Sequence, residues 1–116
     1  MDNGKVFAMK LAKIDPLLVQ KAVRKGRAQQ EVDAVIEWLT GHTAEGVQAL
    51  IRRDADYRAF FEEAPAMNPN RALIKGVVCG VRVEAIEDPL MRDVRYLDKL
   101  VDELAKGKPL EKILRV

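Results

Sequence analysis

The sequence predicts an all-α fold, a compact, orthogonal or bundle-like single domain of about six or seven helices joined by short connections. Apolar residues recur at three- and four-residue spacing through most of the chain, which is the pattern of a helix with one buried face. Asp, Asn or Thr precedes several of these segments and Gly follows several of them, as at the ends of helices. The sequence leaves open whether a short extended arm at the N-terminus is added to this fold.

The composition is typical of one folded domain that covers residues 1–116. Hydrophobic residues make up 48% of the chain and charged residues 33%, which excludes a disordered chain and a membrane protein. Lys5, Lys10 and Lys13 interrupt the apolar residues at the N-terminus, so no signal peptide is predicted. One Cys and one His cannot form a disulfide or a zinc site, and we expect a cytoplasmic protein without metal or cofactor.

Charge is distributed unevenly along the chain. Residues 1–27 contain seven basic and two acidic residues, net +5, and residues 28–70 contain three basic and eight acidic residues, net −5. Residues 71–116 carry net +2. The first two blocks are expected to face each other or to face partners.

Residues 88–106 form the clearest predicted helix. Asp88 is a good N-cap, Pro89 suits the first helical position, and Gly107 suits the position just past the end. One apolar stripe lies along this segment, consisting of Leu90, Val94, Leu97, Val101 and Leu104. We expect the stripe to pack inside the chain and, in addition, to provide a homodimer interface.

Earlier segments carry similar signals. Helices are predicted after Asp15, over residues 29–40, over residues 44–53 with Thr43 as cap, and after Asp54 or Asp56. Residues 6–11 alternate loosely and form a short strand or an extended arm. Pro109 begins a terminal turn of helix that folds back as a lid.

Residues 68–84 are the ambiguous segment. Asn68 and Pro69 form a cap pair in front of a nearly all-apolar run, which favours a buried helix that pairs with the 88–106 helix. The four valines and two glycines of residues 76–83 suit a strand about as well. We predict a helix because no sheet partner is evident.

Several strings in the sequence resemble a bacterial family known as domain of unknown function 2200. These strings are Lys25-Gly26-Arg27, Glu31-Val32-Asp33, Trp38-Leu39-Thr40-Gly41, Phe60-Phe61, Ala64-Pro65, Asn68-Pro69 and residues 76–84 and 87–107. His42 departs from the tyrosine that the family is associated with at this position. The resemblance spans nearly the whole chain and implies a bacterial cytoplasmic protein, with no activity, substrate or catalytic residue attached to it.

Two side chains could carry chemistry by themselves. Cys79 lies near Arg82, which would make a thiol more acidic, but a Cys between valines and glycines is more often a small buried hydrophobe. His42 could act as a general base, although a lone exposed histidine in a turn is the common case and no nucleophile is placed beside it by a known motif. Catalytic residues therefore remain unknown.

An anion or ligand site is a further candidate. Asn68, Arg71 and Arg82, together with His42, could hold an anion near the start of a helix. The competing interpretation is that Asn68 is only a cap and that both arginines pair with nearby carboxylates. Asp54 and Asp56 could hold magnesium but are more often a cap and a solvated neighbour.

Nucleic-acid binding is the third candidate. The basic patch consists of Lys21, Arg24, Lys25 and Arg27, without interleaved aromatic residues for base stacking. Residues 29–53 also resemble a helix-turn-helix, but the acidic first helix would repel phosphate, so a packed helical hairpin is favoured.

The leading functional hypothesis is a non-catalytic cytoplasmic interaction protein that acts through its charged N-terminal surface or as a homodimer. The alternatives are nucleic-acid binding through the basic N-terminal helix, and a small enzyme or anion-ligand binder that uses Arg71 and Arg82. No phosphate-binding loop or nucleophile motif occurs in the sequence, which lowers the expectation of an enzyme.

Overall fold

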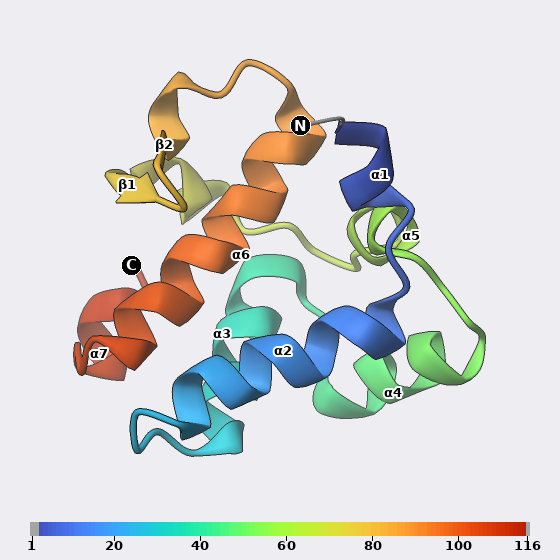
Figure 1. Cartoon of the computed structure of the whole chain (residues 1–116), viewed down its shortest axis with the longest axis horizontal. Coiled ribbons are helices and arrows are strands. Elements are labelled where there is room, and N and C mark those ends of the chain that lie inside the picture. The colour runs from blue at the N-terminus through green and yellow to red at the C-terminus, as the bar shows by residue number, and fades with distance from the viewer. Residues whose placement is uncertain (1–2, 116) are drawn as a thin grey trace.

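The long helix predicted at residues 88–106 lies at the centre of the fold. The computed structural model of the chain describes residues 3–115, and in it helix α6 (Pro89–Ala105) runs through the middle of the molecule, packed against α2 (Leu11–Val23) and α3 (Gln29–Thr40) (Figure 1). The predicted cap is confirmed, because Asp88 Oδ1 accepts hydrogen bonds from the amides of Leu90 at 2.9 Å and Met91 at 3.3 Å.

The remaining elements surround α6. Within residues 3–115 the chain forms seven α-helices, two short 3₁₀-helices and one two-stranded sheet, which confirms the predicted mostly helical domain. The further elements, in chain order, are α1 (Asn3–Phe7), α4 (Ala44–Arg52), α5 (Tyr57–Glu62), η1 (Pro69–Leu73), β1 (Val77–Val78), β2 (Val81–Arg82), η2 (Val83–Ala85) and α7 (Leu110–Ile113).

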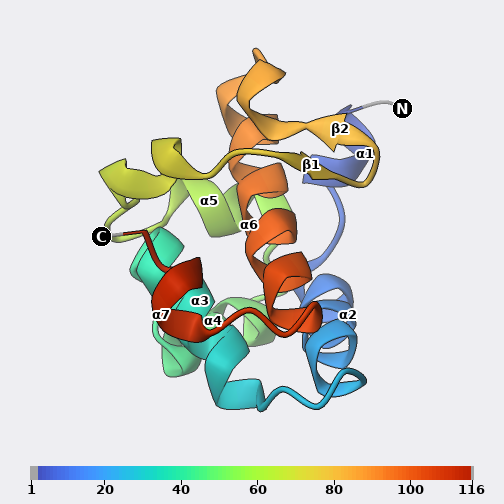
Figure 2. The ribbon, with the colours of Figure 1, turned by 90° about the vertical axis from the view of Figure 1, so that its left-hand side faces the viewer.

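The predicted helix over residues 69–84 is wrong. Only η1 and the start of η2, both short 3₁₀-helices, are helical there, and residues 76–83 form a β-hairpin that packs across α6 (Figure 2), with Val77 opposite Arg82 and Val78 opposite Val81. The two turn residues, Cys79 and Gly80, both have positive φ angles, +52° and +75°, as a two-residue hairpin loop requires. The β-branched valines therefore decide the local structure in favour of strands. No sheet partner was evident elsewhere in the chain, because both strands of the hairpin lie within this segment.

The N-terminal arm is also different from the prediction. Val6 and Phe7 belong to α1, and the only extended pairing of residues 6–11 in the described chain is a single bridge between Lys10 and Asp56. Helix α2 begins at Leu11 instead of after Asp15, so its proline lies inside the helix. The extra turn buries Leu11, which is 2% exposed.

The chain after α5 returns to the end of α3 and leads into η1. The amides of Ala66 and Asn68 donate to the carbonyl oxygens of Thr40 at 3.0 Å and Leu39 at 2.9 Å. Gly41 has a φ of +82°, and a Cβ atom there would lie 2.9 Å from the Ala66 nitrogen. Glycine is therefore required at this position by conformation and by space.

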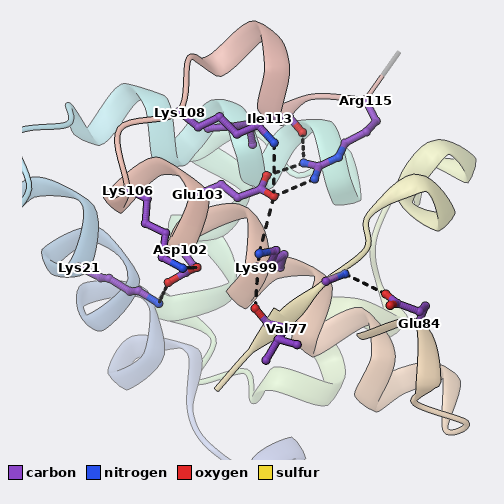
Figure 3. A network of polar contacts seen from close by, with 11 residues as sticks. Lys21, Val77, Glu84, Lys99, Asp102, Glu103, Lys106, Lys108, Ile113 and Arg115 are labelled. Carbon is purple, nitrogen blue, oxygen red and sulfur yellow. Dashed lines mark hydrogen bonds and ion pairs between the residues drawn. The ribbon is translucent and has the colours of Figure 1, made fainter. Parts of the chain in front are cut away.

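The C-terminal turn folds back on α6 as predicted. Ile113 of α7 is fully buried, and Arg115 donates two hydrogen bonds to the Glu103 carboxylate of α6, at 2.6 and 2.8 Å (Figure 3). Lys108 Nζ lies 3.7 Å and Lys99 Nζ 4.0 Å from the same carboxylate. This polar cluster fixes the end of the chain against the central helix.

Candidate functional site

Two hollows lie beside α6. The first, which we call the polar cleft, has a volume of about 360 Å³ and is lined by Pro69, Arg71, Ala72, Pro89, Arg92, Asp93 and Tyr96. The second, the apolar pocket, has a volume of about 250 Å³ and is lined by Val6, Met9, Ile14, Leu17, Leu18, Tyr57, Val94, Arg95 and Asp98. Successive residues of an α-helix are rotated by about 100° around the helix axis. The α6 residues that line the polar cleft therefore point to the opposite side of the helix from those that line the apolar pocket.

Arg71 is held in the polar cleft by contacts on two sides. Its Nε donates to Asp93 Oδ1 at 3.1 Å, and its Nη1 donates to the carbonyl oxygen of Asn68 at 2.9 Å. These contacts join η1 to the first turns of α6 and fix the plane of the guanidinium group. A guanidinium held in this way is suited to bidentate recognition of a carboxylate or phosphate.

Arg92 brings a second positive charge to the polar cleft. Its side chain is half-buried, and within the described part of the chain it has no carboxylate at ion-pair distance. Burial raises the pKa of the neighbouring Asp93 carboxyl, while the charges of Arg71 and Arg92 act in the opposite direction. The cleft wall thus carries two guanidinium groups and one carboxylate, an excess of one positive charge at neutral pH.

Asn68 precedes η1 and is not part of the cleft lining, and its side chain serves as the predicted cap. Asn68 Oδ1 accepts a hydrogen bond from the amide of Asn70 at 2.9 Å. Of the predicted pair, Arg71 contributes its side chain to the cleft, and the carbonyl oxygen of Asn68 only helps to hold that side chain.

His42 does not belong to the cleft, and the expectation that it is an exposed turn residue is wrong. Its side chain is 6% exposed, stacks on the Phe60 ring with centroids 4.9 Å apart, and has Nε2 2.7 Å from the Phe60 carbonyl oxygen. Helix α5 covers the turn, which local sequence could not reveal. His42 is a packed core residue with a satisfied polar atom.

Arg82 and Cys79 lie on the hairpin, away from the cleft lining. Arg82 Nη1 donates to Glu84 Oε1 at 3.0 Å, in agreement with the competing interpretation of this arginine as a structural partner. Cys79 is exposed at the hairpin turn, so the expectation of a buried cysteine is wrong. The predicted helix would have buried this thiol, whereas the turn presents it to solvent.

The basic patch predicted for nucleic acid is partly used within the fold. Lys21 Nζ lies 3.4 Å from Asp102 Oδ1. Arg27 pairs with Glu31 and donates to the carbonyl oxygens of Leu104 at 3.2 Å and Lys108 at 2.7 Å. Arg24 and Lys25 are exposed, so two of the four side chains remain available on this surface.

The remaining candidates are Asp54, Asp56 and the apolar stripe of α6, and each of them makes contacts within the fold. Asp56 Oδ1 caps α5 by accepting from the Ala59 amide at 2.9 Å, and Asp54 Oδ2 lies 3.2 Å from Lys10 Nζ. This contact joins the first charge block to the second. The stripe proposed for a homodimer faces the core, where Val94, Leu97, Val101 and Leu104 are at most 2% exposed and Leu90 is partly buried.

Sequence analysis missed Arg92, Asp93 and Tyr96 of the cleft and Tyr57, Arg95 and Asp98 of the pocket. The available signal was the polar side of the predicted 88–106 helix, where arginine and aspartate follow the start of the apolar stripe. Finding the cleft also required the packing of η1 against this helix, which the wrong prediction for residues 69–84 concealed.

The fold and its hollows define a small, mostly helical protein built around one central helix. None of the helices within residues 3–115 has both the length and the apolar character needed to cross a bilayer. The family described as "Uncharacterized protein conserved in bacteria (DUF2200)" matches residues 5–115, and the chain belongs to this family, as the sequence resemblance indicated.

A crystal structure of an "uncharacterized protein SP1917" has the same fold. It is 46% identical in sequence, with a TM-score of 0.91 over 98% of this chain and 93% of that chain. No curated protein matches the sequence. The family and the similar structure therefore establish the fold and leave the function unassigned.

Proposed function

We propose that the protein is a non-catalytic binding protein of the cytoplasm, whose polar cleft binds the carboxylate or phosphate group of a small molecule. The observation that carries this proposal is Arg92, a half-buried guanidinium without an ion-pair partner in the described chain, which lines the same cleft as the fixed Arg71. A bound anion would compensate the excess positive charge of the cleft wall.

The lining supports binding over catalysis. The seven residues of the polar cleft include no Ser, Thr, Cys, His or Lys, so its wall lacks the commonest nucleophiles, and Tyr96 has no base beside it in this lining other than the Asp93 carboxylate. The one carboxylate, Asp93, is engaged by Arg71. Pro69, Ala72 and Pro89 add apolar surface, which suits the hydrocarbon part of a small ligand. The exposed lone thiol of Cys79 is consistent with a reducing compartment.

Thermal unfolding with citrate and with inorganic phosphate, against chloride at matched ionic strength, tests the proposal. A ligand present at about 100 times its dissociation constant stabilises the folded state by about 2.7 kcal/mol, so the unfolding temperature should rise. Replacing Arg92 by Ala should weaken binding about tenfold or more, because a hydrogen bond to a charged group contributes about 1.5–3 kcal/mol.

Arg24→Ala is the matched control, since it removes the same charge from an exposed position outside the cleft. It should bind both anions as the wild type does. If neither anion stabilises the protein, or if Arg24→Ala and Arg92→Ala weaken binding equally, the polar cleft is not the anion site.

A further inference from the structure

The apolar pocket contains a polar atom that the fold does not satisfy. Among the described residues, the Tyr57 hydroxyl is buried and has no hydrogen-bond partner. Tyr57 lines the pocket and packs against Phe61, with ring centroids 5.1 Å apart. Buried hydroxyls are almost always paired, so the unpaired hydroxyl of a residue that lines the pocket is an unused hydrogen-bonding group beside a space where a ligand can lie.

The walls of the pocket are mainly apolar and its rim is open to solvent. Residues from α1, α2, the segment between them, α5 and α6 form the lining, and within it Met9 and Leu17 are 37% and 55% exposed. Ile14, Leu18 and Val94 line the same pocket as Tyr57. This environment favours a hydrocarbon body.

The charges beside the hydroxyl compensate each other. Arg95 Nη1 donates to Asp98 Oδ2 at 3.0 Å, and both residues line the pocket. Burial raises the pKa of the Tyr57 hydroxyl, and the Asp98 charge raises it further while the Arg95 charge lowers it. A ligand carboxylate would face Asp98 and a ligand ammonium would face Arg95, so a neutral polar group fits best.

The volume sets the size of the ligand. A cavity of about 150 Å³ is large enough to bind benzene, so the 250 Å³ of this pocket can hold a somewhat larger body. We propose that the apolar pocket binds a small neutral amphiphile, whose hydrocarbon part of about six to eight carbons lies between α2 and α6 and whose terminal hydroxyl or carbonyl pairs with Tyr57.

This site is independent of the anion site in the polar cleft. The side chains of Val94, Arg95 and Asp98 point to the opposite side of α6 from Arg92 and Asp93. Failure of anion binding therefore leaves this inference standing, and failure of amphiphile binding leaves the polar cleft unaffected.

An NMR titration of the ¹⁵N-labelled full chain with 1-hexanol tests the inference, with hexanoate and hexylamine as probes of equal chain length. The amide signals of Met9, Tyr57 and Val94 should move and saturate with 1-hexanol. Both charged probes should bind at least about tenfold more weakly, because burying a charged head group without its own partner is costly. Absence of saturable shifts at these residues, or hexanoate binding as tightly as 1-hexanol, would overturn the inference.

Tyr57→Phe isolates the contribution of the hydroxyl. It keeps the ring and the apolar lining, and should weaken 1-hexanol binding about threefold to tenfold, the range expected for one hydrogen bond. Tyr96→Phe is the matched control, because it removes a tyrosine hydroxyl from the other side of α6 and should bind 1-hexanol unchanged. Equal affinity of the wild type and Tyr57→Phe would show that Tyr57 does not pair with the ligand.

Discussion

Two buried polar groups beside α6 differ in how completely the fold satisfies them. The Glu103 carboxylate, in a side chain only 8% exposed, accepts two hydrogen bonds from Arg115 and has the ammonium groups of Lys108 and Lys99 within 4.0 Å (Figure 3). The Tyr57 hydroxyl is also buried, and within residues 3–115 it has no hydrogen-bond partner. The Glu103 carboxylate is surrounded by cations from three segments, whereas the Tyr57 hydroxyl lies among mainly apolar residues, with Arg95 and Asp98 paired to each other nearby.

The difference separates a structural polar group from a candidate binding group. Burying a charge is costly unless it is paired, so the complete pairing of Glu103 indicates that its role is to hold α7 and the chain end against α6. The hairpin joins the same cluster, because Lys99 Nζ also lies 3.4 Å from the Val77 carbonyl oxygen. An unpaired hydroxyl costs less and can be retained where a ligand uses it.

The largest effect is expected from breaking the paired group. Glu103→Ala leaves Arg115 and Lys99, whose side chains are 16% and 14% exposed, close together without their carboxylate. Removing one partner of a buried ion pair costs about 3–5 kcal/mol, so we expect a loss near the lower end of that range in the free energy of unfolding, measured in urea.

Glu111→Ala is the control for this change, because Glu111 is an exposed acid on α7. It should change the free energy of unfolding by less than about 0.5 kcal/mol. A loss from Glu103→Ala as small as that of the control would mean that the cluster around Glu103 does not fix the chain end.

Removal of the unpaired Tyr57 hydroxyl should increase the free energy of unfolding, the opposite of the effect expected from Glu103→Ala. Tyr57→Phe removes a buried hydroxyl for which the described part of the chain offers no partner, and it keeps the ring contacts with Phe60 and Phe61. We expect the ligand-free protein to gain about 1 kcal/mol in the free energy of unfolding, since an unsatisfied buried group costs about 1–3 kcal/mol. A loss of stability would show that the hydroxyl is paired in solution and would remove the contrast with Glu103.

Sequence reasoning predicted the elements whose ends are marked by local chemistry. The start of α6 at Asp88 and Pro89 and the end of α3 before Gly41 each depend on residues within one turn. Apolar spacing also identified the stripe that α6 buries. These features required no knowledge of distant segments.

The wrong predictions have two different causes, one local and one tertiary. The valines of residues 76–83 favour a strand, but a two-residue turn between them needs a positive φ at Cys79, which a cysteine rarely adopts, so the hairpin was not predicted. Helix α2 begins early because the amide of Leu11 donates a hydrogen bond, at 2.9 Å, to the carbonyl oxygen of Ala55, which is 44 residues away in the sequence. Tertiary packing therefore overrode the local signal at the start of α2, whereas the hairpin follows a local preference that was judged the weaker one.

The candidate site was predictable only in part, because it too depends on tertiary packing. Asn68 and Arg71 are neighbours in sequence and were proposed together, whereas Arg92 joins them only through the packing of η1 against α6. Tyr57 carried no signal, because a tyrosine in a predicted aromatic helix is normally a core residue and its missing partner is visible only in three dimensions.

A partly exposed ion pair gives the smallest expected effect and completes the comparison. The hydrogen bond with Arg27, together with the Ala28 amide, lowers the pKa of Glu31 from its ordinary 4.5 to about 2. An acid with a lowered pKa in the folded state contributes stability above its unfolded value, and that stability is lost as the pH falls from about 4.5 toward 2. Exposure limits the contribution to less than about 1 kcal/mol.

Urea unfolding of the wild type and Glu31→Gln between pH 7 and pH 3 measures this loss. The wild type should be the more stable at pH 7, and the difference should shrink as the pH falls below about 4.5. Asp93 and Asp98, whose pKa values are raised by burial, act in the opposite direction but are present in both proteins, so the difference isolates Glu31. Glu37→Gln, an exposed acid on the same helix, controls for the change in charge. If Glu37→Gln gave the same profile as Glu31→Gln, the change in net charge alone would account for the loss of stability. The contact of Arg27 with Glu31 would then not stabilise the fold, unlike the contacts expected of Glu103.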